Sequence, residues 1–533
     1  MMRGTESVWV FGSMLLAGAC GLVLAGRPAH ALNNGLAKTP PMGWSSWNTL
    51  GCGSNMNDAK IRAIADAMVS SGMKTAGYQY INLDDCWQAA TRDQKGNVVP
   101  DPNFTHDMPG LVKYIHGRGL KFGLYSDRGT ATCAGRVGSY GHESQDAKTY
   151  AAWGVDYLKY DNCAPVGDEQ TVFQSMRDAL KTSAPKITFS ICTGYFRDWM
   201  PATGNLWRTY GDIGPSFASM ADIINVNGRL ARSAGPGGWN DPDMMEIGNG
   251  MGDTSDRAQM SMWAIMAAPL IAGNDLTTMS ASTKAILTNV DVIAVDQDSL
   301  GAQGVLVQDN GDVQIWAKRL GQAGSRAVVA LNRNPTTSAS INVPWQAFGL
   351  RPGSGISKNL WTGATYTPNY SWVDTVPAQG VSMIKISSAV DQSATPIVTI
   401  SNTDTRTITD LVVTVDFQID GAAHTDYESV GTFDKTINLD LDGWNGAWNG
   451  SQVVGDFLYT QLGATGSKVL TIHKVDGRTI TNLRISVNFN IDGLPHYDFE
   501  DIGNFPSVST ALVLNGNGGW WDGTKYLGDF LHH

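Results

Sequence analysis

The chain has 533 residues, of which 42% are hydrophobic and only 16% are charged, so it can bury a large core and should form more than one domain. Its net charge is -11 and it contains no basic run, which excludes the electrostatic footprint of a nucleic-acid-binding protein. It also lacks CxxC motifs and histidine-rich clusters, and we therefore predict no metal site and no cofactor.

The first 31 residues have the pattern of an export signal. Arg3 precedes an apolar stretch from Val8 to Ala25, and Ala29-His30-Ala31 matches a small-x-small cleavage site. We therefore expect residues 1–31 to be removed and the protein to be secreted, either outside the cell or into a periplasm. Because the apolar stretch approaches the length that spans a bilayer, an uncleaved membrane anchor is the alternative.

Residues 32–304 alternate short apolar runs with amphipathic segments, which is typical of parallel strands joined by helices. The segment from Asn57 to Ser71, for example, places its apolar residues on one helical stripe, with Asn57 as a candidate cap. Eight predicted strand–helix units indicate a (β/α)8 TIM barrel that carries the catalytic site. The predicted strands are Met42 to Ser46, Tyr78 to Asp84, Lys121 to Ser126, Val155 to Asp161, Ile187 to Cys192, Leu206 to Asp212, Gly238 to Asp243 and Pro269 to Ala272.

Carboxylates stand at the ends of three of these predicted strands. Asp161 follows the apolar run that begins at Tyr157, Asp84 and Asp85 follow the run from Tyr80, and Asp212 comes after an arginine and aromatic residues. A TIM barrel keeps its chemistry at the C-terminal ends of its strands. Since hydrolysis of a glycosidic bond needs two carboxyl groups, we predict Asp161 as nucleophile and Asp212 as its partner.

Aromatic residues accompany these acids. Most of the 49 acidic residues must be caps, turns or solvated charges, so position alone is weak support. Aromatic rings beside carboxylates are typical of sugar-binding pockets, because a sugar has an apolar C–H face and a rim of hydroxyls. The aromatic residues near predicted strand ends are Trp44, Trp47, Trp87, Tyr125 and Trp239.

After the barrel the helical pattern ends. Residues 305–389 show short alternating runs between glycine and asparagine turns, which predicts an antiparallel β-sandwich domain. The remainder is an internal repeat of about 72 residues, since motifs near 408, 417 and 455 recur near 480, 489 and 528. We predict two small all-β repeats, at 390–464 and 465–533.

Tryptophans occupy glycine-rich places in both repeats, where they could form a sugar-stacking platform. Tryptophan in a small β module is more often part of the core, and the core is the favoured interpretation. The repeats would otherwise bind a carbohydrate or another surface ligand. The residues concerned are Trp444, Trp448, Trp520 and Trp521.

Several motifs of the first 390 residues resemble glycoside hydrolase family 27, the α-galactosidases and α-N-acetylgalactosaminidases. They occur in the order of that family and are highly specific together. The motifs are Pro41-Met42-Gly43-Trp44-Ser45-Ser46-Trp47-Asn48, Leu83-Asp84-Asp85-Cys86-Trp87, Gly123-Leu124-Tyr125-Ser126-Asp127, Tyr157-Leu158-Lys159-Tyr160-Asp161-Asn162-Cys163, Trp207-Arg208 with Asp212, and Gly238-Trp239-Asn240-Asp241-Pro242-Asp243-Met244.

The resemblance implies a retaining mechanism, for which the two carboxyl groups lie about 5 to 5.5 Å apart. Asp161 would attack the anomeric carbon, and Asp212 would act first as acid and then as base, while Lys159 keeps Asp161 ionised. Asp84, Asp85 and Lys159 would hold the 4- and 6-hydroxyls of galactose. The other residues that the resemblance places around the sugar are Trp44, Tyr125, Cys192, Thr193, Arg208, Asp241 and Met244.

The resemblance also implies two disulfides, Cys52–Cys86 and Cys133–Cys163. Animal and plant members pair the cysteine at position 192 with one just before the Trp-Arg motif, but residues 202–206 of this chain contain none. Cys192 should therefore be the unpaired thiol.

Substrate choice is the second departure from the family. The α-galactosidases typically carry glutamate and tryptophan after this cysteine, where this chain has Thr193 and Gly194. We expect an α-galactosidase, with an α-N-acetylgalactosaminidase as the alternative and a β-L-arabinopyranosidase as a third reading, which the short Asp84 disfavours. An inactive sugar-binding protein is the alternative outside the enzymes; no predicted carboxylate is missing, which argues against it.

Overall fold

The computed structural model describes residues 32–104, 107–183, 186–322, 324–350, 353–366, 371–389, 395–419, 421–434, 437–441, 447–448, 453–454, 458–460, 468–474, 480–503, 510–515 and 519–532. The predicted export signal lies outside these residues. Within them, no helix is both long enough and apolar enough to cross a bilayer.

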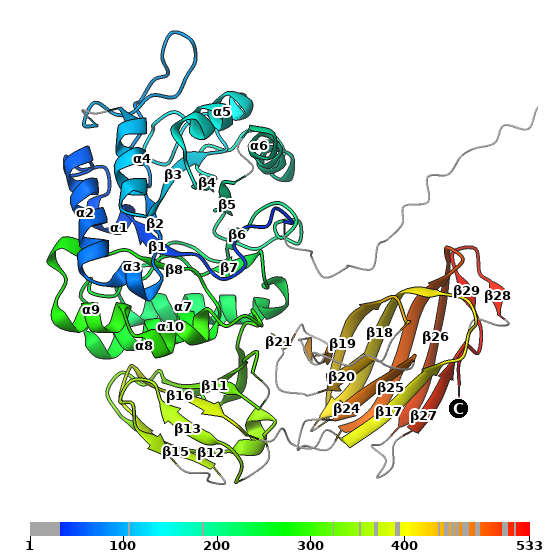
Figure 1. Ribbon diagram of the computed structural model, residues 1–533. Coiled ribbons are helices and arrows are strands. Elements are labelled where there is room, and N and C mark those ends of the chain that lie inside the picture. Colours follow the sequence, from blue (N-terminus) through cyan, green and yellow to red (C-terminus); the bar gives the residue numbers. More distant parts are fainter. Residues whose placement is uncertain are drawn as a thin grey trace, which may run out of the picture.

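Eight parallel strands form the barrel of the N-terminal domain (Figure 1), which confirms the predicted fold class. Their order is β7-β6-β5-β4-β3-β2-β1-β8, and a parallel bridge between Met245 and Ala272 joins the two ends. The strands are β1 Met42–Ser45, β2 Tyr80–Asn82, β3 Lys121–Asp127, β4 Tyr157–Asp161, β5 Thr188–Ile191, β6 Leu206–Arg208, β7 Trp239–Asp241 and β8 Leu270–Ala272.

Several of these strands are shorter than the sequence pattern indicates. β2 ends at Asn82 and β6 ends at Arg208, so Asp84, Asp85 and Asp212 lie in loops rather than on strands. The loops keep these acids at the C-terminal face of the barrel, where the strand ends and the loops after them build the active sites of TIM barrels.

Helices surround the barrel and bury their apolar stripes against it. α2 is capped by Asn57, whose side chain accepts a hydrogen bond from the Lys60 amide, and its buried residues include the predicted Ile61, Ile64 and Met68. The helices are α1 Trp47–Leu50, α2 Asp58–Ser70, α3 Met73–Ala76, α4 Met108–Gly117, α5 Glu143–Trp153, α6 Glu169–Ser183, α7 Phe217–Asn227, α8 Asp253–Ile265, α9 Ala281–Leu287 and α10 Val290–Asp296.

The second domain is a β-sandwich that shares part of its core with the barrel. One face of its six-stranded sheet, including Trp316, Leu331 and Met383, belongs to the same buried cluster as the barrel residues and packs near α8. The other face packs on a two-stranded sheet of β12 and β15. The strands are β9 Val305–Asp309, β10 Val313–Arg319, β11 Arg326–Asn332, β12 Ala339–Pro344, β13 Ile356–Asn359, β14 Thr365–Tyr366, β15 Ser371–Val376 and β16 Gly380–Ser387.

The two C-terminal repeats form one unit, not two separate modules. β18 of the first copy pairs with β25 of the second along most of their length, both sheets contain strands of both copies, and one buried cluster includes Val413 and Val487. The prediction of β repeats is confirmed, but their separation is corrected, because each copy alone would leave the apolar face of its long strands uncovered.

The strands of this unit are β17 Thr395–Asn402, β18 Ile408–Ile419, β19 Ala422–Gly431, β20 Ile437–Leu441, β21 Ala447–Trp448, β22 Val453–Val454, β23 Leu458–Thr460, β24 Val469–Lys474, β25 Ile480–Ile491, β26 Leu494–Gly503, β27 Thr510–Leu514, β28 Trp520–Trp521, β29 Tyr526–Leu527 and β30 Leu531–His532. They form a six-stranded and an eight-stranded sheet. Trp520 and Trp521 are 62% and 46% exposed, so the predicted core position is wrong for both; Trp444 lies outside the described residues.

Candidate active site

Asp161 is the last residue of β4 and is held by two donors. The hydroxyl of Tyr125, on the neighbouring strand β3, donates to one carboxylate oxygen at 2.9 Å, and the Asn162 amide donates to the other at 2.9 Å. Burial, and to a lesser extent the negative charge of Asp161, raises the pKa of the Tyr125 hydroxyl far above its usual range. Tyr125 therefore stays protonated and remains a donor to this carboxylate.

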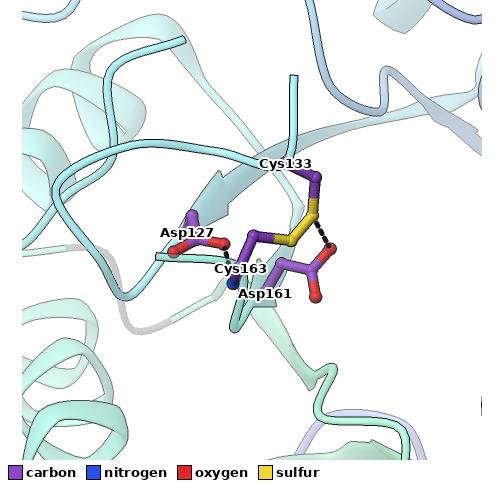
Figure 2. A group of neighbouring side chains, drawn as sticks. All are labelled: Asp127, Cys133, Asp161 and Cys163. Carbon is purple, nitrogen blue, oxygen red and sulfur yellow. Dashed lines mark hydrogen bonds between the residues drawn. A yellow bond between two sulfur atoms is a disulfide. The ribbon is translucent and has the colours of Figure 1, made fainter. Parts of the chain in front are cut away.

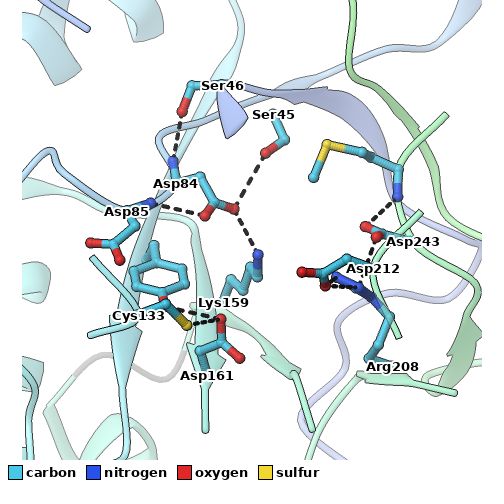
Figure 3. A network of polar contacts seen from close by, with 12 residues as sticks. Ser45, Ser46, Asp84, Asp85, Cys133, Lys159, Asp161, Arg208, Asp212 and Asp243 are labelled. Carbon is cyan, nitrogen blue, oxygen red and sulfur yellow. Dashed lines mark hydrogen bonds and ion pairs between the residues drawn. The ribbon is translucent and has the colours of Figure 1, made fainter. Parts of the chain in front are cut away.

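Lys159 and Asp84 form an ion pair across the barrel, with 2.8 Å between Nζ and Oδ2. Burial alone would lower the pKa of Lys159, but Asp84 foremost, with Asp161 as a lesser contributor, keeps it well above the ordinary value. Figure 3 shows the Lys159 side chain between Asp84 and Asp161. The Ser46 hydroxyl accepts a hydrogen bond from the Asp84 amide and fixes the loop after β2. Lys159 thus remains a cation whose closest partner is Asp84.

Arg208, at the end of β6, joins two acids. It lies 3.1 Å from Oδ1 of Asp212 and 2.8 Å from Oδ2 of Asp243. The Asp243 carboxylate also accepts from the Ile213 amide at 2.9 Å and thereby ties down the loop that carries Asp212. Burial raises the pKa of Asp243 to about 6 against the opposing charge of Arg208. The two acids differ in exposure: the Asp212 side chain is 82% exposed and that of Asp243 only 6%.

The polar groups line a pocket at the C-terminal face of the barrel. Charged, polar and apolar side chains line it, as a sugar requires. The lining residues are Ser45, Asn82, Leu83, Asp84, Leu124, Tyr157, Lys159, Ser190, Cys192, Arg208, Asp241, Asp243, Met244 and Ile271. Figure 3 shows Asp161 and Asp212 on two sides of the same opening.

The residues that line this pocket do not include six of the predicted site residues, namely Trp44, Asp85, Tyr125, Asp161, Thr193 and Asp212. Tyr125, Asp161 and Asp212 make the contacts given above, and the other three have different surroundings. Trp44 is fully buried, and its indole N–H donates to the carbonyl of Asn274. Asp85 is 1% exposed, and its carboxylate accepts from the Cys86 and Ala134 amides, so it braces two loops. Thr193 is not among the lining residues, because its hydroxyl donates to the carbonyl of Tyr195 within its own turn.

Both disulfides lie beside the candidate acids. Cys52–Cys86 and Cys133–Cys163 are formed as predicted, and Cys192 is a buried free cysteine. The Cys133 sulfur lies 3.7 Å from the Asp161 carboxylate (Figure 2). Asp127 completes a cluster of potential metal ligands with these two cysteines and Asp161, but disulfide sulfurs are not thiolates and cannot serve as such ligands.

Comparison with known proteins identifies the family. Residues 39–298 match the family model described as alpha galactosidase A, and residues 310–386 match the alpha galactosidase C-terminal beta sandwich domain. An α-galactosidase of Cyamopsis tetragonoloba is 46% identical over 63% of this chain and 83% of its own length. The chain belongs to the α-galactosidase family, glycoside hydrolase family 27.

Two further members of this family are similar to the chain. Alpha-galactosidase A of Cellvibrio japonicus is 44% identical over 66% of this chain and 93% of its own length. The crystal structure of α-galactosidase I from Mortierella vinacea superposes with a TM-score of 0.65 at 35% identity, over 68% of this chain and all of that one.

Sequence reasoning missed some pocket residues of this family member. Ser45, Asn82, Ser190 and Asp243 line the pocket but are not among the predicted site residues. Asp243 lies within a quoted family motif, and its neighbours Asp241 and Met244 are predicted site residues. Its positive φ of 85°, which turns the carboxylate toward Arg208, is the feature that the sequence does not display.

Proposed function

We propose that this family member is an α-galactosidase that removes terminal, non-reducing α-D-galactosyl residues with retention of anomeric configuration. Relatives that are 46% and 44% identical over most of their own length carry the name α-galactosidase, which supports the activity and an α-galactoside substrate. The proposal also includes a double-displacement mechanism and a role for each site residue.

The different surroundings of Asp161 and Asp212 support the proposed mechanism. Asp161 is half-buried and fixed by Tyr125 and a backbone amide, as a nucleophile that must meet one carbon atom should be. Asp212 stands exposed on the opposite side of the opening, where a leaving group would depart and water would enter. Fixed attack from one side and proton transfer at the open side are the two requirements of a retaining glycosidase.

In the first step an Asp161 oxygen bonds to the anomeric carbon while the bond from that carbon to the leaving oxygen breaks. Asp212 gives its proton to that oxygen, and a galactosyl ester of Asp161 results. In the second step Asp212 takes a proton from water, the water oxygen bonds to the anomeric carbon, and Asp161 is released as a carboxylate.

Recognition of the sugar falls to the charged groups of the pocket. Lys159 offers donors and Asp84 offers acceptors at adjacent points, so one hydroxyl can contact both. Arg208 and Asp241 line another part of the same pocket.

We also propose that the protein is exported. Its two disulfides are typical of proteins that fold in an oxidising compartment, and the N-terminal pattern agrees with this. A test is the N-terminal sequence of the protein recovered from the culture medium, which should begin near Leu32.

One observation keeps an α-N-acetylgalactosaminidase as the second candidate. Thr193 is small and turns its hydroxyl toward Tyr195, so no bulky acid stands at this position of the loop after β5. Specificity constants for nitrophenyl α-galactoside and its N-acetyl analogue decide between the two, because one side chain can supply the ~1.4 kcal/mol that a tenfold preference requires. We expect at least about tenfold preference for the galactoside; equal or reversed values would overturn the choice.

The stereochemical test is independent of that comparison. Proton NMR during hydrolysis should show α-galactose as the first product, which is the signature of double displacement. First release of β-galactose would reject the retaining mechanism while leaving the substrate class intact.

A further inference from the structure

Exposed tryptophans mark one edge of the eight-stranded C-terminal sheet. Trp520 and Trp521 form the short strand β28, which pairs with β29 at that edge. Their exposed fractions of 62% and 46% contrast with the apolar residues of the long strands, such as Val487 and Phe489, which are at most 2% exposed. Packing of this unit therefore does not explain these two rings.

The ladders place the two rings on opposite faces of the edge strand. His496, Tyr526 and Trp521 stand in one cross-strand row, and His496 stacks on the buried Phe489. Leu527 and Trp520 belong to the next row, whose side chains point the other way. Trp521 lies at the end of a core-facing row but extends past the core, with Tyr526 at 5.2 Å.

The repeat provides the same hairpin at the other edge. β22 joins β19 at His424 opposite Val453, as β29 joins β26 at His496 opposite Tyr526. Trp448 pairs with Val453 as Trp521 pairs with Tyr526, so the backbone makes Trp448 the counterpart of Trp521. The strand order places the two hairpins at opposite ends of the sheet. The backbone register therefore places a tryptophan at the matching position of both edges of the sheet.

The chemistry around the exposed rings favours an uncharged ligand. Lys525 lies over the Tyr497 ring at 4.5 Å, and the carboxylate of Asp522 accepts from the backbone of the same turn, so opposite charges adjoin the tryptophans. The outward row that includes Leu527 and Trp520 continues with Tyr497 and Asn488. A neutral sugar chain has apolar faces for rings and hydroxyls for amides, whereas an anionic polymer would need a cationic surface.

We propose that the two edge hairpins are carbohydrate-binding sites that hold a neutral polysaccharide, each through its tryptophan. Two weak sites on one rigid sheet raise the apparent affinity for a polymer far above that for a single sugar unit. The benefit to the enzyme rests on the proposed function, since attachment to the polymer raises the local concentration of terminal galactosyl residues. The binding itself does not depend on catalysis.

The test is native affinity electrophoresis of the full chain in gels that contain galactomannan, hydroxyethylcellulose or xylan. We expect retardation by at least one of them, about tenfold weaker binding for Trp521→Ala or Trp448→Ala, and still weaker binding for the double variant. Tyr366→Ala is the matched control, because Tyr366 is 49% exposed in the sandwich domain. All variants should hydrolyse nitrophenyl α-galactoside at the same rate, which separates this test from that of the proposed function.

Two results would overturn the proposal. One is absence of retardation by all three polysaccharides, or equal retardation of the double variant. The other is a different occupant: binding to heparin, or a dimer in light scattering that the double variant loses, would assign the hairpins to an anionic polymer or to a second copy of the chain.

Discussion

Removal of Lys159 should cost both stability and sugar binding, and a second substitution should restore only the stability. In Lys159→Met the flexible chain is kept and the ammonium is lost, so Asp84, whose side chain is 5% exposed, remains without its 2.8 Å partner. Breaking a buried ion pair costs about 3–5 kcal/mol, because one charge is left uncompensated. Since the Lys159 side chain retains 20% exposure, we expect the low end, ~3 kcal/mol.

The double variant Lys159→Met/Asp84→Asn removes the stranded charge. In urea unfolding of the barrel, the double variant should regain at least half of the stability that Lys159→Met loses. The reason is that removing both partners of an ion pair costs much less than removing one. Activity should not recover. A hydrogen bond to a charged group contributes about 1.5–3 kcal/mol, so loss of the ammonium lowers kcat/KM for nitrophenyl α-galactoside by about 100-fold in the single variant. The double variant, which also loses the charged acceptor Asp84, should be at least as impaired.

Urea unfolding followed by fluorescence, and initial rates, measure the two effects. Lys74→Met is the matched control, since Lys74 is exposed and its ammonium donates to a backbone carbonyl; it should change neither quantity. The reasoning would be refuted if Lys159→Met unfolded at the wild-type urea concentration, or if the double variant were less stable than the single one.

Four further outcomes are expected. Asp161→Ala should abolish hydrolysis and regain turnover with azide, giving β-galactosyl azide, while Asp212→Ala should spare substrates with good leaving groups; near-native unaided activity of Asp161→Ala would reject the nucleophile. Thiol titration of denatured, unreduced protein should count one thiol, from Cys192, and three or five would contradict the disulfides. A chain that ends at Ser388 should fold and hydrolyse small substrates, because the C-terminal unit has its own core. Burial raises the pKa of Asp256 to about 6 from 3.8, so its contribution to stability is present below about pH 4 and is lost as the pH rises through 6; wild type should therefore lose stability relative to Asp256→Asn between pH 4 and 7 in urea titrations, and parallel curves would refute this.

The sequence predicted the barrel because its strands leave a local record. Each strand is a short apolar run, and each is followed by an amphipathic helix, so order and number could be read residue by residue. Strand ends were less well defined. Residue type predicts a strand from Leu206 to Asp212, whereas the pairing with β5 ends at Trp207 and the pairing with β7 ends at Arg208.

The pairing of one strand with another cannot be read from the local sequence in this way. The buried apolar residues lie two positions apart in each repeat, as Val413 and Val415 do in the first and Ile485 and Val487 in the second, which indicates a strand in each copy but not that the two strands pair. The separate modules of the prediction and the buried tryptophans had the same cause. Both predictions rest on the local sequence pattern. The actual arrangement depends on which surfaces the two copies bury against each other.

Anchors just beyond the strand ends decide how the candidate site is assembled. Asp85 is followed directly by the disulfide residue Cys86, and Asp161 by Cys163 after one residue, so covalent bonds hold the loops on one side of the opening. Among the residues that the structure describes, Asp212 is held by Arg208 and by the hydrogen bond from the next residue to Asp243. The cysteines of the first side could be recognised in the sequence, whereas the anchor of the second side depends on a backbone turn at Asp243. We therefore expect reduction of the disulfides to loosen the loops that follow Asp85 and Asp161, while β4 and the Tyr125 hydroxyl still hold Asp161 itself.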